Sequence, residues 1–82
     1  MPVNDNTSQP FGVLCGGASL AFAEIIAGYG SYLCCPEGFI PVGSSVSGNH
    51  VSSVRKAPDV LVYAEATALH LGRTTHLWNV DI

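Results

Sequence analysis

The chain has 82 residues, of which 48% are hydrophobic and 11% are charged, and its formal net charge is −3. This length fits a single domain, residues 1–82. The net negative charge argues against binding to nucleic acid, which needs a positively charged surface. A chain this short hides only part of its apolar surface when it folds alone, so we expect an oligomer or a missing partner segment.

The first ten residues are polar and predict a loop, and their acidic start is unlike a secretory signal peptide. A helix is predicted from about Gly17 to about Leu33. Apolar residues fall on nearly every face of this stretch, so we expect the helix to be enclosed by other elements. Pro36 and Gly38 should end it, because proline cannot continue a helix and glycine permits a turn.

Glu24 is the only charged residue between Asp5 and Glu37. Burying an isolated carboxylate is energetically unfavourable, so we expect Glu24 to have a chemical or structural role in this apolar run. The surrounding run is long enough to cross a membrane, but Glu24 lies near its middle and no Lys or Arg flanks it, so we expect no membrane insertion. The remaining alternatives are a chemical role and an interface or capping carboxylate.

Three strands are predicted after the helix, over residues 40–54, 59–69 and 73–82, with a tight turn at Leu71-Gly-Arg73. One helix followed by strands with short connections argues for an α+β fold, in which an antiparallel sheet packs on the helix. The last predicted strand runs to Ile82, and an enclosed helix needs more sheet than three strands supply. We therefore expect this sequence to be a piece of a larger fold.

The three cysteines show no zinc-binding spacing, because Cys34 and Cys35 are adjacent and Cys15 stands alone. Reduced thiols in a cytoplasmic protein are the simplest interpretation. The three histidines are widely spaced and no pattern of carboxylates joins them, so we expect no metal site.

Two glycines, Gly16 and Gly17, open the predicted helix. Amide groups at a helix start lack partners and sit at the positive end of the helix dipole, so they can bind a carbonyl oxygen. A plain flexible helix entry is the alternative. Cys15 precedes them and is either a small buried residue or part of a site at this helix end.

Two stretches of the sequence resemble one family, the hotdog-fold acyl-CoA thioesterases of the phenylacetate-pathway and 4-hydroxybenzoyl-CoA type, which includes 1,4-dihydroxy-2-naphthoyl-CoA thioesterase. They read Gln9-Pro-Phe-Gly-Val-Leu-Cys-Gly-Gly-Ala-Ser-Leu-Ala-Phe-Ala-Glu24 and Leu69-His-Leu-Gly-Arg-Thr-Thr-His-Leu-Trp-Asn-Val-Asp-Ile82. The resemblance implies a hotdog fold, in which a long central helix is wrapped by an antiparallel sheet, here incomplete with one helix and about three strands. It also implies hydrolysis of an acyl-CoA, with an aromatic acyl group, by a homodimer or homotetramer.

The resemblance assigns roles in catalysis to three residues. Glu24 matches the family's helix glutamate, which is a general base or a nucleophile. The Gly16 amide matches the group that polarises the thioester carbonyl, and Gln9 matches a glutamine that hydrogen-bonds near the thioester. No cofactor is implied, since coenzyme A is part of the substrate.

Five further positions are implied to bind substrate. Gly17 allows close approach to the backbone, and His50 matches a position near the acyl pocket or the coenzyme A path, contributed across a dimer interface. His70 and Arg73 flank a turn whose counterpart touches the nucleotide end of coenzyme A. Cys15 stands where the family usually has histidine.

The sequence departs from the family pattern at Cys15 and in lacking a strand before and a strand after the matched region. These departures keep a second function open, a non-catalytic hotdog module that serves oligomerisation or acyl binding. Hydratase chemistry on the same fold is disfavoured, because the expected His and Asp arrangement is not evident.

Overall fold

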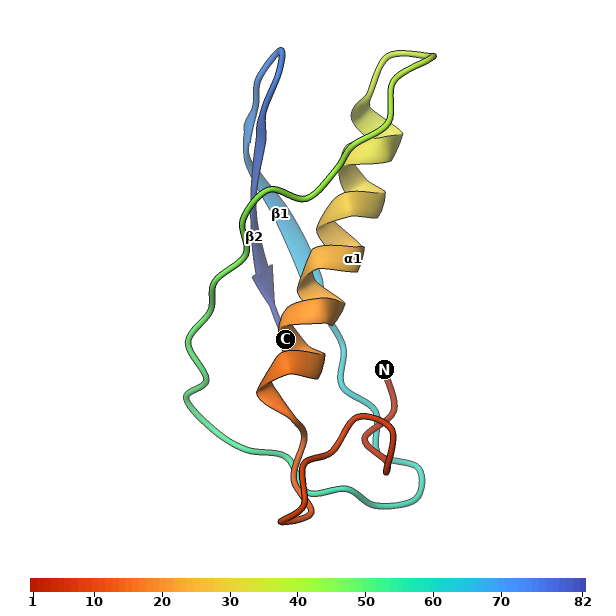
Figure 1. The fold of residues 1–82 in the computed structure, drawn as a ribbon, viewed down its shortest axis with the longest axis vertical. Coiled ribbons are helices and arrows are strands. Elements are labelled where there is room, and N and C mark those ends of the chain that lie inside the picture. Colours follow the sequence, from red (N-terminus) through yellow and green to blue (C-terminus); the bar gives the residue numbers. More distant parts are fainter.

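The computed structural model describes residues 1–82 and consists of one helix and one two-stranded antiparallel sheet (Figure 1). Helix α1 spans Gly16–Cys34, strand β1 spans Glu65–Leu71 and strand β2 spans His76–Asp81. The sheet lies along one side of α1, and the molecule is elongated, measuring 42 × 22 × 17 Å. The predicted α+β arrangement of a helix against an antiparallel sheet is therefore confirmed, with two strands in place of about three.

Helix α1 begins and ends as the sequence predicts. Its N-cap residue is Cys15, whose extended backbone (φ −71°, ψ 133°) is followed by helical geometry from Gly16. At the other end the Cys35 N–H donates to the Tyr32 carbonyl at 3.3 Å, and Pro36 prevents a further turn. Gly38 then adopts φ +90°, a conformation that favours glycine and turns the chain back along the helix.

The hairpin of β1 and β2 presents one face to the helix. Alternate residues of β2 are half-buried (His76, Trp78 and Val80), and the residues between them are exposed. A bulge between Ala68 and His70 shifts the register of the pair. The turn predicted at residues 71–73 lies at residues 72–75, where the Gly72 N–H donates to the Thr75 carbonyl at 2.8 Å.

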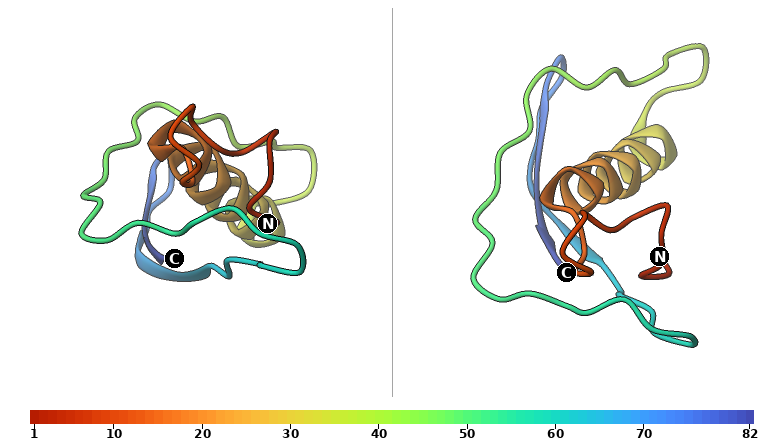
Figure 2. Two further views of the ribbon diagram at one scale, coloured as in Figure 1. Left: turned by 90° about the horizontal axis from the view of Figure 1, so that it is seen from below. Right: turned by 60° about the horizontal axis from the view of Figure 1, so that its bottom comes forward.

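The strand predicted over residues 40–54 is not present. This segment is extended and runs beside α1 before it swings outward (Figure 2), but it has no neighbouring strand with which to form a ladder. Its backbone pairs only at its far end, where the Leu14 N–H donates to the Val54 carbonyl at 2.8 Å. The prediction was wrong because alternation of Val and Ser supplies extended backbone, whereas a strand also needs a hydrogen-bonded partner.

Residues 59–64, predicted as the start of a strand, pair instead with the N-terminus. The Val3 N–H donates to the Val60 carbonyl at 3.1 Å, and the Val62 N–H donates to the Met1 carbonyl at 2.9 Å. Val3 is 1% exposed and is the buried hydrophobic residue of the chain. On the surface nearby, the hydrogen bond and charge of Lys56 lower the pKa of Asp5.

The expectation of an enclosed helix was also wrong. Large apolar side chains on α1 remain open to solvent, with Ile25 64%, Tyr29 66% and Leu33 69% exposed. The radius of gyration is 14.3 Å, against about 12 Å for a compact domain of this length. The reason is that two strands and one extended segment cover only part of the helix surface. The protein contains no helix whose length and apolarity would let it cross a membrane.

Polar groups join the sheet to α1 at Ser31, which is 6% exposed. The Trp78 Nε1–H donates to Ser31 Oγ at 2.7 Å, and His76 Nδ1 lies 2.8 Å from the same oxygen. Trp78 also packs closely against the helix at Gly30, because a Cβ on Gly30 would lie 2.8 Å from its Cη2. The absence of a side chain at Gly30 therefore allows the hairpin to approach the helix.

We predict opposite effects of alanine at two glycines of α1. A Cβ on Gly28 meets nothing within 4 Å, so Gly28→Ala should raise the free energy of unfolding by about 0.5–1 kcal/mol through helix propensity. Gly30→Ala drives a methyl group into Trp78 and should lower that free energy by about 1–3 kcal/mol. Urea denaturation followed by circular dichroism measures both; equal effects would contradict the packing of Trp78 on the helix.

Candidate functional site

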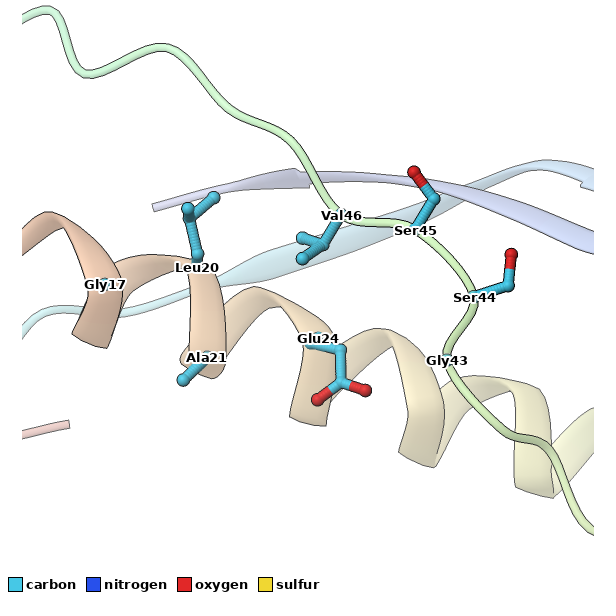
Figure 3. A pocket seen from close by; sticks show the side chains of 8 residues that line it. All are labelled: Gly17, Leu20, Ala21, Glu24, Gly43, Ser44, Ser45 and Val46. Atoms are coloured by element: carbon cyan, nitrogen blue, oxygen red, sulfur yellow. The ribbon is translucent and has the colours of Figure 1, made fainter.

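Two hollows lie along α1, both formed between the helix and the segment that follows it. The first, which we call the carboxylate hollow, has a volume of about 430 Å³ and contains Glu24 (Figure 3). It is lined by Gly17, Leu20, Ala21, Glu24, Gly43, Ser44, Ser45 and Val46. The second, the amide hollow, has a volume of about 330 Å³ and lies at the start of the helix. It is lined by Gln9, Leu14, Gly16, Ser19, His50, Ser52, Ser53 and Val54.

The carboxylate of Glu24 lies against Gly43. A Cβ built on Gly43 would overlap Glu24 Oε1, so the returning segment passes close over the carboxylate because this position has no side chain. Glu24 itself is exposed, which corrects the expectation that the helix environment encloses it. Gly43 belongs to the site, yet nothing in the sequence marked it apart from its place in the segment after the helix.

The amide hollow gathers hydrogen-bond donors. The Cys15 carbonyl accepts from the amides of Ala18 (3.1 Å) and Ser19 (3.3 Å), whereas the amides of Gly16 and Gly17 have no backbone acceptor. Cys15 offers no side-chain cap for Gly17, so both amides remain free at the positive end of α1, and Gly16 is the one of the two that lines the amide hollow. An acceptor atom of a ligand fits this position.

Two side chains frame the free amide of Gly16. The His50 ring packs on this residue, since a Cβ on Gly16 would lie 3.2 Å from His50 Cε1. Gln9 accepts a hydrogen bond from the Phe11 N–H through Oε1, which leaves its amide NH₂ as the free donor. The structure thus brings His50 together with Gln9 and Gly16, from which it is far apart in the sequence.

The structure keeps Glu24 apart from this cluster. Eight residues separate Gly16 and Glu24 on one helix, a rise of about 12 Å. They line different hollows, and Gly17 is the predicted residue that shares the hollow of Glu24. One chain therefore holds a donor end and a carboxylate that cannot both contact the same small group.

The remaining predicted residues lie outside both hollows. Cys15 lines neither, although its Sγ is 3.8 Å from where a Cβ on Gly17 would stand. His70 and Arg73 are exposed at the hairpin tip, toward the opposite end of α1 from Gly16 (Figure 1). The His70 ring packs on Gly72 there.

Ser19 is a lining residue that the sequence reasoning missed. It is 8% exposed and contributes to the amide hollow. The available signal was its position three residues after Gly16, which places both residues on one face of a helix.

The other chemistry-bearing side chains are dispersed. No three His, Cys, Asp or Glu residues come together as a group able to hold a metal ion. All three cysteines are free thiols in the structure.

Comparison with known proteins identifies relatives over the whole chain. Residues 11–82 match the thioesterase superfamily. The chain is 40% identical to 1,4-dihydroxy-2-naphthoyl-CoA hydrolase of Escherichia coli over 82 residues, covering 100% of this chain and 58% of that protein. It is 39% identical to the proofreading thioesterase EntH of Cronobacter sakazakii, again over 100% of this chain and 58% of that protein.

A solved structure shares the fold. The crystal structure of a Haemophilus influenzae thioesterase matches with a TM-score of 0.87 and 42% sequence identity, covering 99% of this chain and 55% of that one. The hotdog thioesterase fold predicted from the sequence is thereby confirmed. The chain spans about half the length of the curated relatives it matches.

We predict that Gly16 and Gly17 respond differently to alanine. Gly16→Ala should displace the His50 ring, because the new methyl group would stand 3.2 Å from Cε1. Gly17→Ala meets Cys15 Sγ at an ordinary 3.8 Å and should leave His50 in place. The His50 ring signals in a heteronuclear NMR spectrum report both outcomes. An unmoved His50 signal in Gly16→Ala would contradict the arrangement of the amide hollow.

Proposed function

The chain belongs to the thioesterase superfamily, and on that basis we propose that it hydrolyses an acyl-CoA thioester. The observation that carries the proposal is the pairing on α1 of free amides at the helix start with the Glu24 carboxylate eight residues later. Thioester hydrolysis needs a donor for the carbonyl oxygen and a base or nucleophile for the carbon, and these two groups supply them.

The Gly16 amide polarises the thioester carbonyl. As negative charge develops on the oxygen, the free amide and the positive end of α1 stabilise it. Glu24 accepts a proton from the attacking water, or attacks the carbonyl carbon itself to form a mixed anhydride that water then hydrolyses. The carbon–sulfur bond breaks, the coenzyme A thiolate leaves and takes up a proton, and a carboxylic acid is the second product.

Other residues position the substrate. Gln9 donates through its free NH₂ near the thioester, and His50 packs beside Gly16 at the path to the acyl group. Gly17 permits close approach to the backbone, and Cys15 lies near the thioester without acting as nucleophile, because no base is paired with it. His70 and Arg73 hold the nucleotide end of coenzyme A by hydrogen bonds to phosphate.

An aromatic acyl group is the proposed substrate class. Support comes from the E. coli relative, whose name gives 1,4-dihydroxy-2-naphthoyl-CoA as its substrate. The proposed reaction uses neither a metal nor a separate cofactor, and the cytoplasmic location expected from the free thiols stays a prediction.

Two copies of the chain supply one site in this proposal. The carbon and oxygen of a carbonyl are about 1.2 Å apart, whereas Gly16 and Glu24 of one helix are separated by about 12 Å. A second α1 running antiparallel brings its Glu24 to the Gly16 of the first. The exposed apolar side chains of α1, including Ile25 and Tyr29, support an assembly through this helix.

We predict that Glu24→Gln abolishes hydrolysis of benzoyl-CoA. The amide keeps the shape of the side chain but cannot accept a proton or form an anhydride, so the rate should fall by at least about a thousandfold, or ~4 kcal/mol in the barrier. Glu37→Gln, an exposed site just after α1, is the matched control and should keep the full rate. Thiol release measures both.

Retention of more than about a tenth of the rate by Glu24→Gln would remove this residue from the mechanism. Binding of benzoyl-CoA without turnover by the unsubstituted protein would favour the alternative, a non-catalytic hotdog module.

We predict that two inactive variants restore activity when they are mixed. Gly16→Pro removes the amide donor at the first helical position, where proline is tolerated and the extended Cys15 backbone suits it. Refolded together with Glu24→Gln, it should yield about a quarter of the wild-type rate, because about half of random dimers are mixed and each holds one intact site. Each variant refolded alone is the control. No recovery in the mixture would place the site within one chain.

A further inference from the structure

We propose that the Ser19 hydroxyl is a second hydrogen-bond donor to the thioester carbonyl oxygen, beside the Gly16 amide. This inference rests on the proposed thioester hydrolysis and adds a residue to it. The substrate atom that Ser19 recognises is an acceptor oxygen that gains negative charge during the reaction.

The Ser19 residue is largely buried, and its hydroxyl has no hydrogen-bond partner in the chain. It is 8% exposed, and its hydroxyl makes no hydrogen bond within the chain. The other buried serine of α1, Ser31, bonds with both Trp78 and His76. The buried side-chain oxygen without a partner is Ser8 Oγ and not Ser19 Oγ, so the Ser19 hydroxyl is open to the amide hollow that it lines, where a bound molecule can accept its proton.

The usual local partner for this hydroxyl is occupied. A serine inside a helix commonly donates back to the carbonyl four residues earlier, which here is that of Cys15. That carbonyl already accepts from the amides of Ala18 and Ser19, and the hydroxyl makes no bond to it. The Ser19 proton therefore remains available to a ligand.

Helix geometry directs Ser19 toward the free amide. Side chains of a helix tilt toward its N-terminus, so a residue covers the turn before it, and Ser19 lies three residues after Gly16. Gly16 has no side chain to fill that surface. Both residues line the amide hollow, which is the arrangement needed for two donors to converge on one oxygen.

The hydrogen-bond donors that line the amide hollow favour a ligand atom that accepts hydrogen bonds. The polar groups of the hollow are the Gly16 amide, the Gln9 NH₂ and the Ser19 hydroxyl at the helix start, together with the side chains of His50, Ser52 and Ser53, and no carboxylate lines it. A carbonyl oxygen becoming an oxyanion is stabilised by the donors at the helix start, and the gain is largest in the transition state.

The test is removal of the hydroxyl, with benzoyl-CoA as the probe. Ser19→Ala should lower kcat by about a hundredfold while KM stays within about threefold, because the donor acts mainly on the developing oxyanion. Ser19→Cys preserves the volume and offers only a weak donor, so it should behave like Ser19→Ala. Ser31→Ala is the matched control: it should lose stability through the unpaired Trp78 and His76 and keep its kcat.

A second readout observes the carbonyl directly. Benzoyl-CoA labelled with ¹³C at the thioester carbonyl, bound to Glu24→Gln, should show an infrared carbonyl band at lower frequency than in water. Adding Ser19→Ala to this variant should reverse part of that shift, whereas adding Ser31→Ala should not.

The outcomes separate the two proposals. Wild-type hydrolysis with unchanged kcat and an unchanged carbonyl band in Ser19→Ala would overturn the role of Ser19 alone. If the wild-type protein neither hydrolyses benzoyl-CoA nor shifts its carbonyl band, both the proposed function and the role of Ser19 fail.

Discussion

The uncapped start of α1 is the constraint on which the candidate site depends. Cys15 enters the helix with extended backbone and no side-chain cap, so the amides of Gly16 and Gly17 stay free. A cap such as serine or aspartate at this position would accept from the Gly17 or Ala18 amide and stabilise the helix, whereas the Gly16 amide would stay unpaired. The chain instead keeps two unpaired amides at the positive end of the helix, and Gln9 and His50 line a hollow with the first of them, Gly16. The helix start is therefore less stable than a capped one would be, but its unpaired amides can bind an oxygen atom.

The polar anchor at Ser31 decides which side of the helix remains open. Trp78 and His76 both bond with this oxygen, and Trp78 rests on Gly30, so the hairpin is held against one face of α1. The face that carries Glu24 is left to the extended segment after the helix and to solvent. The same packing that fixes the sheet therefore leaves the carboxylate accessible to a substrate and to a second copy of the chain.

Glycine serves a different purpose at each place where the chain approaches α1. Gly30 admits Trp78, Gly43 lets the returning segment pass over the carboxylate of Glu24, and Gly16 admits the ring of His50. Gly28 meets nothing, so it has no such packing role. The identity of a glycine in the sequence does not distinguish these cases, because the neighbour that occupies the missing Cβ position comes from a distant part of the chain.

Local sequence patterns predict those features that depend on neighbouring residues. The span of α1, its stop at Pro36 and the final hairpin follow from apolar periodicity, turn residues and alternation, and the family resemblance pointed to Glu24, Gly16 and Gln9. Three-dimensional packing is needed to see that residues 40–54 lack a strand partner, that Glu24 is exposed, and that Ser19 lines the amide hollow. It also separated Gly16 and Glu24 into different hollows. These outcomes depend on contacts between residues far apart in the chain, which local patterns do not encode.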